Sequence, residues 1–195
     1  LAASKAVDLK AGSLALSLHT DIEGTDLTEA GQAIAEGATF GAFRYDEFVS
    51  EAIAKRSVKI NISVVDSGTA AAAKLRKGVS LGAITGQAQN YARLIANRPA
   101  NVINPVSLAA EARKMARGLA GLRCTVLDEK QLATKKMGGI LAVGQGSKTP
   151  PRLIVLQYTP AKAGKNIPTI GLVGKAITFD SGGISLKPGE GMHDM

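Results

Sequence analysis

Two short apolar segments in the first third of the chain have the patterns of strands. Residues 14–18 form a short apolar run, and residues 58–65 alternate apolar and polar side chains, as a half-buried strand does. Between them, residues 25–29 (TDLTE) offer capping residues before an Ala-rich stretch with apolar residues at helical spacing, at Ile34, Ala38, Phe40 and Phe43. The pattern predicts a strand, a helix and a strand, which is the minimal α/β unit.

A second helix is expected to begin near residues 67–69 (SGT) and to run to about Asn97. Arg98 precedes Pro99, and a proline disfavours the helical conformation of the residue before it. We interpret residues 76–97 as a linking helix. The segment 97–105, with two prolines and three asparagines, has a loop composition and marks the expected domain boundary.

Beyond the boundary, Ser107 is expected to cap a helix that stops at Gly121, and residues 124–127 are expected to form a strand. A short helix should then run from Glu129 to Lys136.

Three apolar runs follow, at residues 140–143, 153–156 and 170–173. Because these runs are continuous rather than alternating, they predict strands covered on both faces, as in the parallel sheet of an α/β protein.

Composition agrees with an ordinary globular protein. Of 195 residues, 45% are hydrophobic and 21% charged, which excludes collagen-like, coiled-coil and disordered chains. Cys124 is the single cysteine, so no intramolecular disulfide can form, which fits a reducing cytoplasm. The chain shows neither an apolar run of about 20 residues nor a signal peptide, so we expect a soluble, cytoplasmic protein with no membrane partner. Its first residue is Leu, which suggests a processed product or a fragment.

The formal charge of +8 is unevenly distributed. Residues 1–104 carry 11 basic and 10 acidic groups, whereas residues 105–195 carry 13 and 6. A basic surplus can indicate a nucleic-acid or other acidic partner. The basic residues are scattered and only 4% of the chain is aromatic, so platforms for base stacking are scarce. Nucleic-acid binding is therefore an alternative that we do not favour.

The densest group of unusual residues lies at 173–192, directly after the last apolar run. Ligands of open α/β sheets bind outside the carboxyl ends of the strands, so this position is a candidate site. A phosphate-binding loop is excluded, because Gly174-Lys175 is followed by Ala176 and residue 169 is not glycine.

Two further catalytic interpretations fit the residues poorly. A nucleophilic Ser181 in Asp-Ser-Gly-Gly would need a histidine base, and the only histidines are His19 and His193 in a chain whose α/β pattern contradicts a double β-barrel. The segment 144–146 (GQG) lacks the third glycine of a dinucleotide fingerprint and is better interpreted as a turn.

A metal site fits the residues better. Asp180 lies in a glycine-rich loop, where a carboxylate can approach an ion closely. Lys175 could ligate a metal only as the neutral amine, with its pKa far below its usual value. Lys187 could place a cation where a carbonyl oxygen becomes an oxyanion. Taken alone, these residues also fit a simple turn and a solvated surface lysine.

Longer motifs carry a resemblance to a known family. Residues 173–188 (VGKAITFDSGGISLKP) closely resemble the metal-site segment of the leucyl aminopeptidase (cytosol aminopeptidase) family. The loop 97–101 and the blocks at 137–147 and 150–153 are similar to further segments of that family, and the resemblance is good from about residue 80 onward. The departures are Arg98 where the family has Thr, Ala176 where it usually has Gly, and the pair His193-Asp194 in a stretch that is commonly acidic.

The resemblance implies a metal-dependent exopeptidase that removes N-terminal residues, often leucine, from peptide substrates. It implies two divalent metal ions (Zn or Mn) and a homohexamer. By position, Lys175 would ligate one ion and Asp180 would bridge both. Lys187 would be the catalytic lysine that binds and polarises the scissile carbonyl, and Met195 would line the pocket for the first side chain of the substrate.

The same comparison implies the organisation of the chain. We expect an α/β protein with a partial, macro-like N-terminal α/β domain (residues 1–75), a linking helix (76–97) and the first part of a catalytic α/β domain with a mostly parallel central sheet (98–195). The remaining family ligands, which are acidic, would lie beyond Met195. We therefore expect an internal fragment that is inactive by itself, and the alternative is a catalytically inactive basic binding module.

Overall fold

The computed structural model describes residues 1–17, 24, 26–51, 59–65, 72–162 and 168–195. The chain divides into two compact units, Leu1–Arg98 and Pro99–Met195. Both units combine helices and strands, so the mixed α/β class predicted from the sequence is confirmed.

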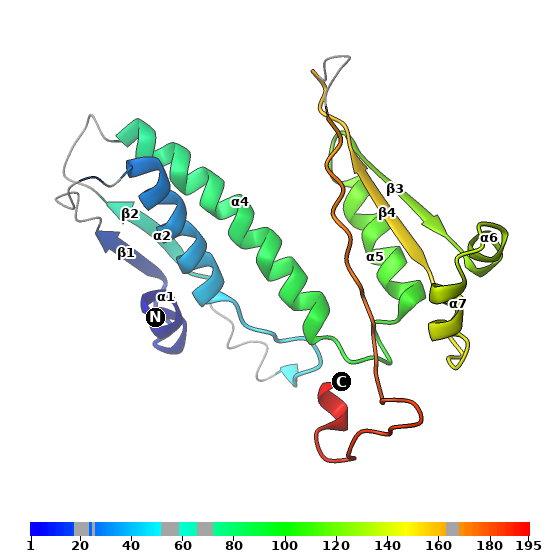
Figure 1. Ribbon diagram of the computed structural model, residues 1–195. Coiled ribbons are helices and arrows are strands. Elements are labelled where there is room, and N and C mark those ends of the chain that lie inside the picture. The colour runs from blue at the N-terminus through cyan, green and yellow to red at the C-terminus, as the bar shows by residue number, and fades with distance from the viewer. Residues whose placement is uncertain (18–23, 25, 52–58, 66–71, 163–167) are drawn as a thin grey trace. The chain divides into compact units, whose positions relative to one another are not determined.

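The first unit contains α1 (Ala2–Asp8), β1 (Ser13–Ser17), α2 (Leu27–Ala42), β2 (Asn61–Val65) and α4 (Ala72–Asn97). Strands β1 and β2 pair in parallel, from Ser13 opposite Asn61 to Ser17 opposite Val65. The predicted strand, helix, strand and long helix are all present (Figure 1). Leu18, Thr25, Val58 and the predicted start of the last helix at residues 67–69 lie outside the described residues.

Helices α2 and α4 pack along their lengths (Figure 1). Asp26 caps α2 as predicted, because its Oδ1 accepts hydrogen bonds from the backbone N–H groups of Thr28 (2.7 Å) and Glu29 (3.1 Å). On α4, Gly78 and Gly82 recur one turn apart, and a Cβ atom at either position would overlap a backbone carbonyl of α2. The close approach of the two helices therefore requires glycine at these positions.

Polar contacts fix the same helix pair. The hydroxyl of Thr85 donates a hydrogen bond to Glu36 of α2 at 2.6 Å. The guanidinium of Arg93 lies over the rings of Phe40 and Phe43, at 4.0 and 4.2 Å from their centroids. The α4 helix is thus held to α2 at several points along its length.

An ion pair follows the end of α4. The Arg98 guanidinium donates two hydrogen bonds to the carboxylate of Glu47, both at 2.7 Å. Only 16% of the Arg98 side chain and 29% of the Glu47 side chain are exposed. The pair ties the last residue of the first unit to the segment that follows α2.

The second unit contains α5 (Pro105–Arg117), β3 (Leu122–Leu127), α6 (Glu129–Thr134), α7 (Gly138–Gly144), β4 (Leu153–Tyr158) and the short 3-10 helix η1 (Met192–Asp194). Strands β3 and β4 pair antiparallel, from Leu122 opposite Tyr158 to Leu127 opposite Leu153. Helix α5 packs against β3, and α6 and α7 form the connection between the two strands.

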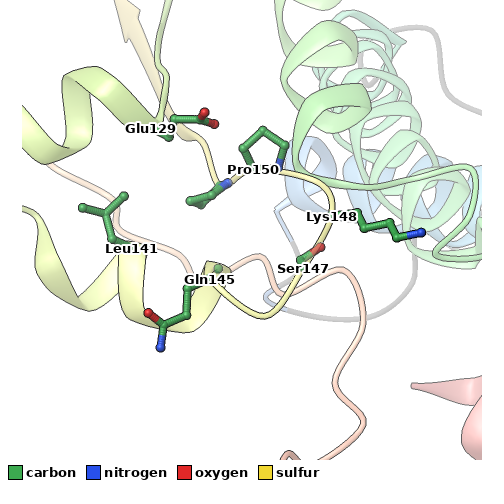
Figure 2. A pocket seen from close by; sticks show the side chains of 8 residues that line it. Glu129, Leu141, Gln145, Ser147, Lys148 and Pro150 are labelled. Carbon is green, nitrogen blue, oxygen red and sulfur yellow. The ribbon is translucent and has the colours of Figure 1, made fainter.

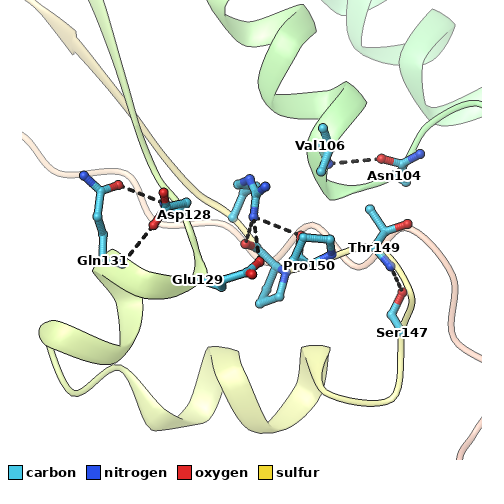
Figure 3. Close-up of polar contacts among 10 residues, drawn as sticks. Asn104, Val106, Asp128, Glu129, Gln131, Ser147, Thr149 and Pro150 are labelled. Carbon is cyan, nitrogen blue, oxygen red and sulfur yellow. Dashed lines mark hydrogen bonds and ion pairs between the residues drawn. The ribbon is translucent and has the colours of Figure 1, made fainter.

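The start of α5 differs from the prediction in detail. The N-cap is Asn104 rather than Ser107, because Pro105 occupies the first helical position, where its missing N–H costs nothing. Asn104 Oδ1 accepts the N–H groups of Val106 and Ser107, both at 3.1 Å, and the Ser107 hydroxyl accepts the N–H of Asn104 at 2.8 Å. Figure 3 shows the contact between Asn104 and Val106. At its other end the helix stops at Gly118, not at Gly121.

The three apolar runs were predicted as strands covered on both faces; two of them are not strands, and the third is a strand that is partly exposed. Residues 140–143 belong to α7, because a short apolar run can equally be one side of a helix. Residues 170–173 form no strand in the described structure and are exposed, with 95% exposure at Leu172.

The third run is a strand, β4, but Val155 and Leu156 are each 44% exposed and the pairing is antiparallel. The predicted mostly parallel sheet is therefore not found among the described residues of the second unit. Among the described strands of this unit, β4 pairs with β3. After β3 the chain passes through α6 and α7 and then runs back beside β3 in the opposite direction, so the two strands are antiparallel.

Within the described residues, no helix combines the length and the apolar character that a bilayer crossing requires.

Candidate functional site

The glycine-rich segment folds into a loop that turns back on itself. Gly182 and Gly183 have φ angles of 92° and 65°, in the left-handed region that favours glycine. A Cβ atom at Gly182 would overlap the backbone carbonyl oxygen of Ser185. The turn is closed by the backbone N–H of Lys187, which donates a hydrogen bond to the carbonyl of Ser181 at 2.9 Å. The two glycines thus bring Lys187 back to the residue next to Asp180.

Asp180 has a partner on each carboxylate oxygen. Oδ1 accepts the backbone N–H of Gly182 at 3.0 Å, and the Lys187 ammonium lies 3.3 Å from Oδ2. The Gly182 hydrogen bond is the main reason why the pKa of Asp180 is lowered, and the Lys187 hydrogen bond and charge and the charge of Lys175 act in the same direction. Asp180 is therefore ionised at neutral pH, which is the state that a metal ligand needs.

Lys187 also contacts Met195. Its Nζ lies 3.3 Å from the sulfur of Met195, which directly follows η1. The turn into η1 passes through Gly191, whose φ is 74°. A third of the Lys187 side chain is exposed, compared with 58% of the Asp180 side chain. The Lys187 ammonium thus contacts both the carboxylate of Asp180 and the sulfur of Met195, which is a weak acceptor.

The structure brings together three of the four residues singled out by the sequence, which are Asp180, Lys187 and Met195. Lys175 is exposed, and it acts on Asp180 through its charge rather than through a hydrogen bond. The sequence predicts separate roles for Asp180 and Lys187, and it does not predict their direct contact. The available signal was the pair Gly182-Gly183 between them, since consecutive glycines permit a tight reversal of the chain.

The donors present do not amount to a complete metal site. In the described ranges, no group of three or more His, Cys, Asp or Glu side chains could hold an ion. Asp180 is an ionised oxygen donor and Lys175 an exposed amine, so each could contribute one ligand. One carboxylate and one amine do not fit two divalent ions, and the described residues supply only part of such a site.

A separate open hollow of about 500 Å³ lies in the second unit between α6, α7 and the segment that leads into β4 (Figure 2). Its polar wall is formed by Glu129, Gln145, Ser147 and Lys148, and none of the four predicted site residues lines it. Arg152 donates a hydrogen bond to the carbonyl of Pro151 at 2.8 Å and lies 3.5 Å from Glu129. The charged wall is thus partly neutralised within the protein, and the hollow lies apart from the Asp180 loop.

Comparison with known proteins gives a consistent result. The model of the "Cytosol aminopeptidase family, catalytic domain" matches residues 90–195. The chain is 45% identical over 169 residues to a "Probable cytosol aminopeptidase" of Aquifex aeolicus (strain VF5). The aligned residues cover 86% of this chain and 32% of that relative. A protein of the same name from Acidobacterium capsulatum is 38% identical over 195 residues, with 99% and 37% covered. The chain therefore spans about a third of the length of these relatives.

Solved structures resemble the described fold over nearly the whole chain. The "Bottromycin maturation enzyme BotP in complex with Mn" has a TM-score of 0.79 and 36% identity, and covers 99% of this chain and 39% of that chain. The apo leucyl aminopeptidase of Trypanosoma cruzi has a TM-score of 0.72 and 26% identity, with 99% and 36% covered.

Proposed function

Because the chain belongs to the cytosol aminopeptidase family, we propose that it is part of a metal-dependent leucyl aminopeptidase, which releases N-terminal amino acids from peptides in intracellular protein turnover. The observation that carries the proposal is the loop in which Gly182 and Gly183 place the ammonium of Lys187 against the ionised carboxylate of Asp180. This loop lies within the part of the chain that matches the catalytic domain of the family.

Each site residue receives a role under this proposal. Lys175 and Asp180 would each contribute a ligand to the divalent ions (Zn or Mn) that the proposal requires. The donors among the described residues do not complete such a site, and the Mn complex of BotP supports manganese as one candidate. Such ions, when bound, would supply Lewis acidity and would activate a water molecule.

The contribution of this chain's own side chains is electrostatic. The Lys187 ammonium is a fixed positive charge that stabilises the oxyanion formed on the scissile carbonyl. Met195, whose sulfur contacts Lys187, lines the pocket for the first side chain of the substrate.

The proposal includes the assembly and the domain organisation. Residues 1–75 form part of a macro-like N-terminal domain, residues 76–97 the linking helix and residues 98–195 the first part of the catalytic domain. The division of the chain into units at Arg98 supports this boundary. The proposed enzyme is a cytoplasmic homohexamer.

The test measures leucine release from leucine p-nitroanilide by a full-length protein that contains this chain, with and without Mn²⁺ or Zn²⁺. Lys187→Ala should lower kcat about 100- to 1,000-fold, the typical effect of removing one oxyanion-stabilising group. Asp180→Asn should abolish the metal-dependent activity. Lys148→Ala, which changes an exposed lysine of the separate hollow, is the matched control and should leave activity unchanged.

Two results would contradict the proposal. One is leucine release that requires no metal, and the other is unchanged activity in Lys187→Ala. The 195-residue chain by itself should release no leucine, because its described residues do not complete a metal site. Metal-dependent release by this chain alone would contradict that part of the proposal.

A further inference from the structure

A bulky residue of the first unit has a backbone conformation that its own side chain does not explain. Phe48 has a φ of 62°, in the left-handed region, where the Cβ atom of an L-residue comes too close to the following carbonyl oxygen. The ring gains little from this conformation, because Phe48 is 70% exposed. Strained conformations of this kind persist only where the surrounding structure holds them. A restraint close to Phe48 is therefore required.

The residue before Phe48 carries such a restraint. Nε and Nη2 of Arg98 donate to the two carboxylate oxygens of Glu47, each at 2.7 Å, which is the two-bond geometry of a strong ion pair. The side chains of Arg98 and Glu47 are largely buried, so solvent screens this pair less than it screens an ion pair at the surface. Tyr45 lies close to the pair, since burial and the charge of Glu47 raise the pKa of Tyr45. The side chain of Glu47 is thus held in place directly before the strained residue.

The arginine of this pair lies at the boundary of the first unit. Arg98 is the last residue of that unit and precedes Pro99, which disfavours a helical conformation of residue 98. The backbone N–H of Arg98 donates a hydrogen bond to the carbonyl of Ile95 in the last turn of α4, at 3.2 Å. The backbone of Arg98 is therefore anchored to α4, and its side chain connects the end of α4 to the turn at residues 47–49.

We propose that the ion pair of Arg98 and Glu47 is a clamp, which keeps Phe48 in its left-handed conformation with the ring exposed. The clamp and the turn of residues 47–49 form one two-state element. While Arg98 holds Glu47, Phe48 stays at positive φ. When Arg98 is withdrawn, the turn relaxes to negative φ and the ring takes another position. The conformation of the turn thus depends on the residue at the unit boundary, although the two are far apart in the sequence.

The test follows the sign of φ at Phe48 in the isotope-labelled 195-residue chain. The nuclear Overhauser effect between the amide and Hα protons of one residue is strongest at positive φ, where these two protons lie closest. The original chain should show a strong effect at Phe48. Arg98→Gln and Glu47→Gln each remove one charge of the pair, and in both variants the effect should weaken to the level of residues with negative φ.

A double-mutant cycle measures the strain that the clamp maintains. In the original chain, Phe48→Gly should raise the ratio of folded to unfolded molecules about fivefold, because the relief of strain exceeds the backbone entropy that glycine loses. In the Arg98→Gln background the turn has already relaxed, so the same substitution should leave the ratio unchanged or lower it. Urea unfolding followed by circular dichroism gives both ratios.

The connection to the boundary has a readout of its own. Glu47→Gln releases the side chain of Arg98, so the Arg98 amide, which is bonded to the carbonyl of Ile95, should exchange with solvent faster than in the original chain. Phe48→Gly leaves the ion pair intact and should keep the original exchange rate.

Arg44→Gln is the matched control. Arg44 is four residues from Phe48 and pairs with Asp8 at 3.0 Å, with 40% of its side chain exposed. Its replacement removes an arginine from the same segment but not from the clamp, so the Overhauser effect at Phe48 should stay strong. Far-UV circular dichroism establishes that each variant is folded.

Two results would overturn the clamp. One is a strong Overhauser effect at Phe48 in either Arg98→Gln or Glu47→Gln, and the other is an equal gain from Phe48→Gly with and without Arg98. An unchanged exchange rate of the Arg98 amide in Glu47→Gln would overturn the connection to the boundary. None of these residues belongs to the candidate functional site, so each result is independent of the proposed peptidase function.

Discussion

Glycine has opposite roles in the α2–α4 helix pair and in the loop of residues 180–195. In the helix pair, Gly78 and Gly82 are buried and allow two backbones to approach, so the missing side chain is the essential property. In the loop, Gly182 and Gly183 supply positive φ angles that L-residues adopt at a cost. Packing therefore determines the stability of the helix pair, whereas backbone conformation determines where the charges of the loop lie.

The largest effect is expected in the helix pair. Gly78→Ala would place a methyl group on the backbone carbonyl of Thr28, which cannot move aside as a flexible side chain can. We expect a loss of about 2–3 kcal/mol in the free energy of unfolding, at the upper end of the cost of overpacking. Urea unfolding followed by circular dichroism measures it.

The matched control is Gly37→Ala on α2, where a Cβ would meet nothing within 4 Å. It should stabilise the protein by roughly 0.5–1 kcal/mol, because alanine loses less backbone entropy than glycine in a helix. Equal effects at Gly78 and Gly37 would disprove the packing argument.

A smaller and local effect is expected in the loop. Gly182→Ala combines a φ of 92° with an overlap at the Ser185 carbonyl, so the turn that returns Lys187 to Asp180 should be lost. Gly183→Ala has a φ of 65° and open space around the new Cβ, and should cost only about 1 kcal/mol of backbone strain.

Two-dimensional NMR spectra of the Gly182→Ala and Gly183→Ala variants measure this difference. Gly182→Ala should shift the amide signals of residues 180–187 strongly, and Gly183→Ala weakly, while global thermal unfolding changes little in either. A loop whose Lys187 signal is unchanged in Gly182→Ala would contradict the role assigned to the turn.

The smallest effect concerns acid stability in the first unit. The hydrogen bond from Arg98 is the main reason why the pKa of Glu47 is lowered, and burial opposes it. Because the folded chain holds Glu47 at a lower pKa than the unfolded chain, the pair contributes its stability above the ordinary glutamate pKa. That contribution is lost as the pH falls through the lowered value.

Glu47→Gln should therefore reduce stability at pH 7 and make the loss of stability below about pH 4 shallower. Urea midpoints between pH 7 and pH 3 test this expectation, and Asp46→Asn, an exposed neighbour in the same segment, is the control. Parallel acid profiles for Glu47→Gln and the original chain would show that the pair contributes no pH-dependent stability.

The sequence by itself determined the features that depend on local chemistry. The alternation at residues 61–65, the cap at Asp26 and the end of α4 before Pro99 follow from the conformational preferences of a few neighbouring residues. Asp180 and Lys187 are predicted as site residues because they lie in one contiguous motif, and Met195 is predicted from its position in the family resemblance. Their individual assignments as ligand, catalytic lysine and pocket residue stay predictions.

Tertiary structure alone decided the features that depend on distant partners. An apolar run such as residues 140–143 suits a helix or a strand, and only its neighbours in space made it α7. The antiparallel pairing of β3 with β4 depends on how α6 and α7 return the chain. The contact between Lys187 and Asp180 depends on two positive φ angles acting together, and such a geometry becomes visible only when the chain is folded.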